Sequence, residues 1–355
     1  MSSYAPLLEL YKSRLREFVR QPARIFWVYG FPTVLAVGLG LAFKSKQVDE
    51  IHVDLIQTGR WTDVEKTFTT HNSNTGRSLA PHIIAHTSSS EVAEKRLKTG
   101  KTALVILVDG PTKVEYRFDP TRSEAVSARN AVDAVLQRAA GRSDPVITTD
   151  TEVNEPGSRY IDFLIPGLIG MNTMGGGLFG VGFLIVNFRV GKLLKRFMAT
   201  PMPRRDFLLA IMGARLTFLL PDIAVLLSLG YFAFQMPIRG SLLLMFLVDV
   251  LGALAFAGIG LLIAARANNT ETVSGLVNLV MLPMWLLSGV FFPSDRFPAW
   301  MQPIIQALPL TQLINALRMI ILEGAGVMEV WPAMLILSAW SVVTFIIALK
   351  IFKWN

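Results

Sequence analysis

The chain alternates between long stretches without a charged side chain and shorter polar connections. A helix of about 20 apolar residues crosses the roughly 30 Å hydrocarbon core of a bilayer. Four uncharged stretches have about that length, at residues 25–43, 163–188, 272–294 and 330–349. With two further apolar segments they predict six transmembrane helices, at residues 24–43, 161–187, 207–235, 240–265, 272–292 and 331–351.

Between the first two predicted spans the pattern changes to short strands and helices. Strand-like segments at 52–58, 83–86, 103–108 and 114–118 alternate with helical segments at 62–68, 89–98 and 123–140. This alternation predicts a small α/β domain, which we place at residues 45–158. Ser88 and Glu91 resemble a capping box at the start of the second of these helices.

The N-terminal residues 1–22 predict an amphipathic helix. Leu8, Tyr11, Leu15 and Phe18 recur at helical spacing, with basic residues on the other faces. We expect this helix to lie on the cytoplasmic membrane surface, before a first span at 23–44. A plain cytosolic extension of that span is the alternative.

The loop charges predict the orientation of the chain. Basic residues precede the first span, and residues 189–205 carry six basic residues and no acid. Because cytoplasmic loops are enriched in Lys and Arg, both observations place the N-terminus inside and residues 45–158 outside. Lys350 and Lys353 place the C-terminus inside as well, so we expect a multi-pass protein of the cell membrane.

A further uncharged stretch, residues 297–317, would make a seventh span but is not expected to cross the membrane. Pro298, Pro303 and Pro309 interrupt its helix. We predict instead a re-entrant segment at 293–322 that dips into the outer leaflet. The expected fold is therefore a polytopic α-helical membrane protein with six transmembrane helices, a re-entrant outer segment and an inserted extracytoplasmic α/β domain. Its five-helix membrane domain spans 159–355, with a cytoplasmic loop at 188–206.

Charge and composition exclude several functions. The net charge is +8, but the region from Lys44 to Arg159 contains 16 basic and 16 acidic residues, so no basic face for nucleic acid is expected there. The absence of cysteine excludes disulfides and thiolate chemistry. His82 and His86 have the spacing of a helical metal site but bracket a strand-like pair, so we expect no metal site. No grouping of residues predicts a catalytic site.

Two stretches resemble the type-2 ABC exporter permeases. Residues 287–300 (Leu-Ser-Gly-Val-Phe-Phe-Pro-Ser-Asp-Arg-Phe-Pro-Ala-Trp), 308–311 (Leu-Pro-Leu-Thr) and 315–318 (Asn-Ala-Leu-Arg) are similar to a sequence block after the fifth span of that family. Residues 190–205 are similar to its cytoplasmic loop. Leu308 replaces the usual Asn, and Val190 and Gly191 stand where a Glu is usual. The arrangement of one span, an outer domain and five spans also resembles one branch of the family.

The resemblance implies the transmembrane permease subunit of an ATP-driven exporter. The chain has no Gly-x-x-x-x-Gly-Lys-Ser/Thr motif, so we expect no cofactor on it, and ATP and Mg on a separate ATPase subunit present in two copies. Further expected partners are a second permease copy, identical or not, membrane lipids and an envelope protein bound by the outer domain. The residues implied in coupling to the ATPase are Arg189, Lys192, Leu193, Leu194, Lys195, Arg196, Phe197 and Met198. Those implied in the family block and re-entrant segment are Ser288, Gly289, Phe291, Phe292, Pro293, Pro309, Leu310, Thr311, Arg318 and Glu323.

Several side chains within the spans are further candidates. Asn172, Met174, Asn278 and Met281 are candidates for a substrate pathway. Gly176 and Gly180 either line that pathway or allow close helix packing. Arg215, Asp222 and Asp249 form either an internal ion pair or a relay.

Two other functions remain open. One is an ion-coupled secondary transporter with Asp222 and Asp249 as coupling acids, and the other is a membrane protein that binds a partner without transport. The sequence does not indicate a substrate.

Overall fold

The structure is a computed structural model that describes residues 5–43, 50–56, 61–75, 81–109, 113–143, 145, 157, 159–198, 204–267 and 269–351. The chain divides into two compact units, and each is described by itself. A membrane unit takes Met1–Lys44 and Val153–Asn355, and an α/β unit takes Ser45–Glu152.

All regular secondary structure among the described residues of the membrane unit is helical. Its helices, including the π-helical segments η1, η2, η3 and η6, are α1 (Ala5–Val19), α2 (Pro22–Ile25), η1 (Phe26–Gly30), α3 (Phe31–Ala42), α7 (Tyr160–Gly177), η2 (Leu178–Phe183), α8 (Leu184–Val190), α9 (Leu193–Met198), α10 (Arg204–Ser228), η3 (Leu229–Ala233), α11 (Leu242–Arg266), α12 (Thr270–Leu287), η4 (Ser294–Arg296), η5 (Ala299–Met301), α13 (Gln302–Ala307), α14 (Pro309–Arg318), η6 (Met319–Glu323) and α15 (Val327–Ile351).

Six helices among the described residues are long and apolar enough to cross a membrane. They are Pro22–Ala42, Tyr160–Val190, Leu209–Ala233, Leu242–Arg266, Thr270–Leu287 and Val327–Ile351. The prediction of a polytopic helical membrane protein with about six spans is therefore confirmed.

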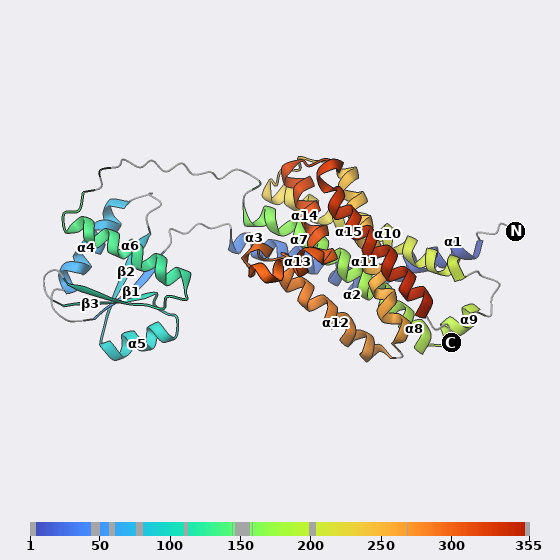
Figure 1. The fold of residues 1–355 in the computed structure, drawn as a ribbon, viewed down its shortest axis with the longest axis horizontal. Helices are drawn as coiled ribbons and strands as arrows, with labels where there is room; N and C mark the ends of the chain where they lie inside the picture. Colours follow the sequence, from blue (N-terminus) through green and yellow to red (C-terminus); the bar gives the residue numbers. More distant parts are fainter. Residues whose placement is uncertain are drawn as a thin grey trace. The chain divides into compact units, whose positions relative to one another are not determined.

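The second and fourth spans form the interior of the membrane unit. In each, 61% of the most apolar window is buried, against 17 to 33% in the other four spans. Helix α11 packs against α7, α14 and α15 (Figure 1). Its Gly260 lies against the backbone of α7, where an added Cβ would be 2.7 Å from the carbonyl oxygen of Gly177. Two glycines therefore permit the close approach of these central helices.

The predicted end of the fifth span at Phe292 was wrong. Helix α12 ends at Leu287, because Gly289 adopts a left-handed backbone conformation with φ of 79°. That conformation is accessible mainly to glycine, and it terminates the helix one turn before its apolar sequence ends.

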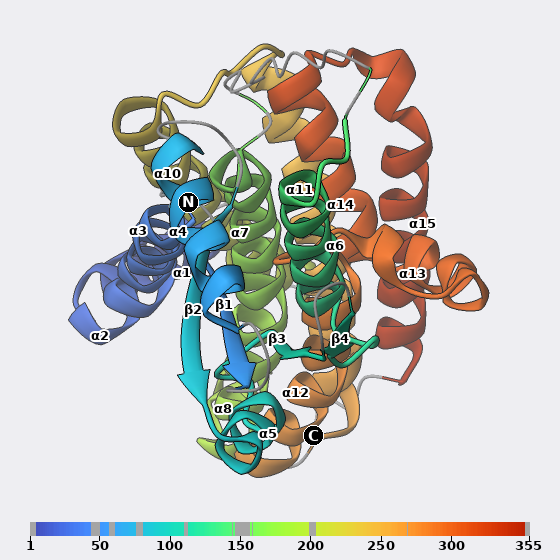
Figure 2. The same ribbon diagram turned by 90° about the vertical axis from the view of Figure 1, so that its left-hand side faces the viewer.

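The proline-rich segment after α12 is bent as the sequence suggested. The helical pieces Ala299–Ala307 and Pro309–Glu323 meet at 86°, with Leu308 extended between them. Figure 2 shows α13 lying across the direction of its neighbours α14 and α15. A proline at the first position of α14 and another near the start of α13 fit this break, since proline is favoured in the first turn of a helix, where its missing N–H costs no hydrogen bond.

The α/β unit contains a four-stranded sheet in the order β2-β1-β3-β4. Its elements are β1 (Glu50–Ile56), α4 (Trp61–Thr75), β2 (His82–Ser88), α5 (Ser90–Lys98), β3 (Leu104–Val108), β4 (Val114–Arg117) and α6 (Ser123–Ala139). Strand β1 is parallel to β2 and β3, and β4 is antiparallel to β3. The connection from β1 through α4 to β2 and the connection from β2 through α5 to β3 run in opposite directions across the sheet. Because such connections are right-handed, α4 and α5 lie on opposite faces. Figure 1 shows α4 and α6 on one face and α5 on the other.

Two local predictions in this unit were wrong. Helix α4 continues two turns beyond the predicted end at Phe68, because the Asn72 side chain bonds both the backbone N–H and the carbonyl of Ile83 in β2. The capping box at Ser88 does not form. Ser88 belongs to β2 and its hydroxyl donates to Asp54, while Ser89 precedes α5 without a side-chain cap.

Candidate functional site

The predicted cytoplasmic loop contains a short helix with exposed basic side chains. Helix α8 ends at Val190, the chain turns through Lys192 with φ of 53°, and α9 follows. Leu193, Lys195 and Arg196 are exposed on α9. The side chains of Leu194, Phe197 and Met198 lie outside the described ones. The loop therefore presents a basic helical surface, as a protein docking element would.

Arg189 belongs to the predicted coupling residues but does not face outward. Its Nη1 donates to the carbonyl oxygens of Ala264 and Ala267, at 2.8 and 2.6 Å. These are carbonyls at the C-terminal end of α11, where a positive charge is favourable for the helix dipole. Arg189 thus connects the start of this loop to the end of α11.

The residues of the family block form the junction between α12 and α14. Arg318 is the centre of this junction. Its guanidinium donates to the carbonyl oxygen of Phe163 in α7 at 3.1 Å and to that of Gly289, after α12, at 2.6 Å. The guanidinium carbon also lies 3.5 Å from the centre of the Phe163 ring.

The remaining residues of this block divide into buried and exposed groups. Ser288, Gly289, Pro309, Leu310 and Thr311 are buried, Phe291 is half-buried, and Phe292, Pro293 and Glu323 are exposed. Glu323 is therefore exposed to the surroundings of the protein, whereas Arg318, five residues before it, is half-buried.

The four candidate pathway residues occupy different environments in the described chain. The Asn172 amide donates to the carbonyl oxygen of Val28 at 2.8 Å, so it connects α7 to the first span. Met174 and Met281 are buried in the apolar core, and Asn278 is exposed on α12. Of the four, only Asn278 is on a surface that a second chain or a substrate would reach.

A polar network that sequence reasoning found only in part lies inside the membrane unit. Arg215 and Asp222 of α10 form an ion pair with Nη2 and Oδ2 3.6 Å apart. Thr173 of α7 donates to Oδ1 of Asp249 of α11 at 2.8 Å. Gly176 of α7 leaves space for this network, because a Cβ at that position would overlap the Arg215 guanidinium. Gly176 therefore makes room for a buried cation and does not serve helix contact alone.

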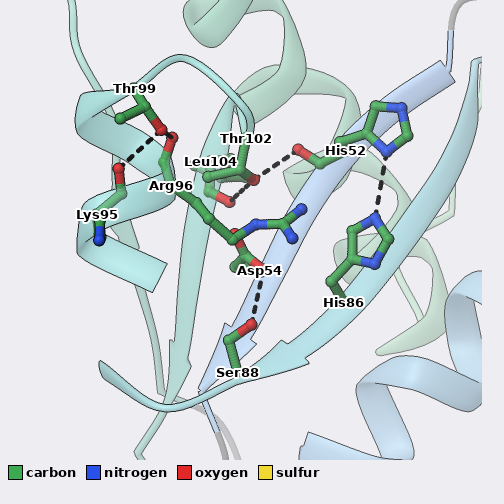
Figure 3. A network of polar contacts seen from close by, with 9 residues as sticks. All are labelled: His52, Asp54, His86, Ser88, Lys95, Arg96, Thr99, Thr102 and Leu104. Carbon is green, nitrogen blue, oxygen red and sulfur yellow. Dashed lines mark hydrogen bonds and ion pairs between the residues drawn. The ribbon is translucent and has the colours of Figure 1, made fainter. Parts of the chain in front are cut away.

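The α/β unit has a second polar network, between β1, β2 and α5. Asp54 is fully buried and accepts from Ser88 Oγ and Arg96 Nε, each at 3.0 Å. Figure 3 shows Arg96 reaching Asp54 from α5, and the rings of His52 and His86 facing one another from neighbouring strands, with Nδ1 and Nε2 3.4 Å apart. His82 and His86 lie on strand β2 and not on a helix. The described residues contain no cluster of three or more His, Asp or Glu able to hold a metal.

Nearby on the same unit, the Tyr116 hydroxyl donates to Asp133 Oδ1 at 3.2 Å. Burial and the charge of Asp133 raise the pKa of Tyr116 to about 12. This tyrosine is therefore a neutral donor that joins β4 to α6.

Six apolar spans, a basic loop helix and a bent segment after the fifth span define a polytopic membrane protein of the transporter class. Residues 23–350 match the family described as ABC-2 family transporter protein, and the chain belongs to this family. The resemblance found in the sequence is thereby confirmed.

Three relatives illustrate the similarity. The chain is 31% identical to ABC transporter G family member 20 of Dictyostelium discoideum, over 60% of this chain and 30% of that protein. It is 26% identical to Probable multidrug ABC transporter permease YbhR of Escherichia coli (strain K12), over 50% and 49% of the two chains. It is 35% identical to Inner membrane transport permease YhhJ of the same organism, over 33% and 31%. The chain thus spans less than half the length of each relative.

Proposed function

We propose that this chain is the transmembrane permease subunit of an ABC exporter, which moves a substrate out of the cytoplasm with energy from a separate ATPase. The observation that carries the proposal is the family match over residues 23–350, which includes α9 and all six candidate spans except the first residue of the first and the last residue of the sixth. The relatives named as permeases support the same class. An ion-coupled carrier and a non-transporting protein have no comparable support.

We further propose the orientation that the loop charges indicate. Residues 1–22 form an interface helix at the cytoplasmic surface, residues 23–44 the first span, and residues 45–158 an extracytoplasmic domain. Residues 159–355 form the five-helix membrane domain, with residues 293–322 re-entrant from the outer side. The relative named as an inner membrane permease supports the cell membrane as the location.

The proposed partners follow from the missing nucleotide motif and from the exposed surfaces. Two copies of an ATPase subunit supply ATP and Mg and bind the basic surface of α9. A second permease copy faces the first, so that Asn278 on the exposed side of α12 reaches a substrate pathway between them. Arg189 transmits movement of the docked loop to α11, because its guanidinium donates hydrogen bonds to the carbonyl oxygens at the end of that helix.

The coupling assignment is tested by placing acids on α9. We expect the double variant Leu194→Asp, Phe197→Asp to insert normally but to lose transport while the partner still hydrolyses ATP, because buried acids at a docking interface are costly. Transport and ATPase rates of the reconstituted complex measure this. Val92→Asp, at a position 50% exposed on α5 of the α/β unit, adds the same group outside this loop and should leave both rates unchanged. Normal transport by the double variant would refute the assignment.

A further inference from the structure

Three charged side chains of the third and fourth spans lie inside the membrane unit. Arg215 and Asp222 come from α10, and Asp249 comes from α11. Their side chains are 10%, 3% and 0% exposed, respectively. Charged groups at membrane depth are rare and are retained for a function more often than for stability.

The two carboxylates lack the partners that buried ionised acids normally have. No described residue forms a hydrogen bond with either oxygen of Asp222, whose nearest cationic nitrogen is that of Arg215 at 3.6 Å. In Asp249, Oδ1 accepts from Thr173, whereas Oδ2 has no partner among the described residues. Asp162 in the same unit shows the contrast, since it is also fully buried but is bonded by Arg159 and Gly157.

The cluster does not balance its charge. With both acids ionised, the Arg215 guanidinium pairs with Asp222 and lies within electrostatic range of Asp249, so two carboxylates share one cation and one negative charge is left in an apolar surrounding. Tyr29 of η1 is within electrostatic range of Asp222 and Arg215 but supplies no positive charge.

The elements packed against α10 offer no second cation to the cluster among their described residues. On α1, Lys12 and Arg14 pair with Glu9 and Glu17. Arg16 is exposed on α1, Arg266 is exposed at the end of α11, and Arg189 of α8 donates to carbonyls at the end of α11. None of these three forms an ion pair with Asp222 or Asp249.

We propose that Asp222 and Asp249 form a proton-binding site that holds one proton, with Arg215 as the fixed counter-charge. One bound proton makes the cluster neutral and turns a carboxylate into a hydroxyl donor for a neighbouring oxygen. The adjacent guanidinium disfavours a metal cation at the same place, because like charges repel strongly in an apolar medium. Binding is a simple transfer of the proton between water and a carboxylate oxygen, with no other reactant.

The site lies where α7, α10 and α11 meet. Thr173 and Gly176 of α7, Arg215 of α10 and Asp249 of α11 all contribute, and the π-helical segment η2 begins two residues after Gly176. A rearrangement of α7 against α10 and α11 therefore changes the surroundings of the proton. This gives the site a means to exchange it.

Infrared spectroscopy of the full chain in lipid vesicles tests the proposal. The aspartate side chains carry a carbon-13 label, so that the carbonyl band of a protonated aspartic acid is identified by its isotope shift. At pH 7 we expect one protonated aspartate per chain, unchanged by sodium. No protonated aspartate, or two, would overturn the proposal, and loss of the band on addition of sodium would replace it with a metal-cation site.

Variants locate the proton. Asp222→Asn and Asp249→Asn each leave one acid to balance Arg215, so each should abolish the band. Asp162→Asn is the matched control, because that buried acid is already paired, and the band should remain. A band that persists in both cluster variants places the proton elsewhere and rejects the site, and the wild-type measurement stands even if a variant fails to insert.

Discussion

Contacts with neighbouring residues of the membrane unit fix the position of the Arg215 side chain. Its guanidinium fills the space above Gly176, donates to the carbonyl oxygen of Asn172 at 3.4 Å and faces Asp222. A side chain at Gly176 and the arginine cannot occupy the same volume. The identity of residue 176 therefore decides whether the ion pair forms.

We predict that Gly176→Ala destabilises the protein by about 3 kcal/mol, because displacing Arg215 leaves Asp222 buried without its cation. The neighbouring Gly175 has no atom within 4 Å of an added Cβ. Gly175→Ala should therefore be neutral or stabilise by up to about 1 kcal/mol, as alanine is the better helix former. Thermal unfolding in detergent measures both, and equal effects of the two substitutions would contradict this account.

In the α/β unit, Asp54 is a second fully buried acid, and Arg96 is its cation. We predict that Arg96→Ala lowers the stability of this unit by about 3 kcal/mol, since an unpaired buried charge remains. Arg117→Ala removes two exposed ion pairs, to Glu94 and Glu115, and should leave stability nearly unchanged, because such pairs are screened by solvent. Hydrogen exchange of the β1 amides in the full chain reports the difference. Similar exchange in both variants would show that the Asp54 pair is not needed.

At the scale of elements, Arg318 joins three segments that are distant in sequence. It connects α14 to α7 and to the turn after α12 through two carbonyl oxygens. Gln carries no charge and cannot donate to both carbonyl oxygens as the guanidinium does. We therefore predict that Arg318→Gln lowers the free energy of unfolding by about 2 kcal/mol, and with it the midpoint of thermal unfolding. Arg296→Gln is the control, because Arg296 is exposed in the same block. An equal loss in both variants would mean that the contacts of Arg318 do not fix the segment.

The spans were predictable because apolar length alone selects helices that cross a bilayer. Their boundaries were less so. The fifth span ends at Gly289 through its backbone conformation, and α4 extends because Asn72 finds Ile83 on a neighbouring strand. Neither cause is visible in the hydrophobic pattern, since one depends on a single φ angle and the other on a contact between elements.

The candidate site was predictable as a set of segments but not as a set of contacts. The family block and the basic loop stand out in the sequence, and Arg215, Asp222 and Asp249 are conspicuous as charges within spans. Thr173 gave no such signal, and Gly176 was expected only to line a pathway or to allow close helix packing, because their contacts depend on which helices lie opposite them. The inward-facing position of Arg189 was missed for the same reason.

At the scale of the whole molecule, the proposed function requires the α/β unit and α9 to lie on opposite sides of the membrane. If the proposed orientation holds, the α/β unit is outside the cell and α9 is inside, where an ATPase is available. The chain has no cysteine, so a single introduced cysteine can be labelled without a background. Two exposed lysines are suitable positions, Lys113 in the α/β unit with 74% of its side chain exposed, and Lys195 on α9.

Labelling of Lys113→Cys and Lys195→Cys with a membrane-impermeant maleimide is the most direct test. In intact cells we predict that the cysteine at position 113 is labelled and that the cysteine at position 195 is labelled only after the membrane is permeabilised. Labelling of both positions in intact cells, or of neither until permeabilisation, would place the two on one side of the membrane and contradict the account.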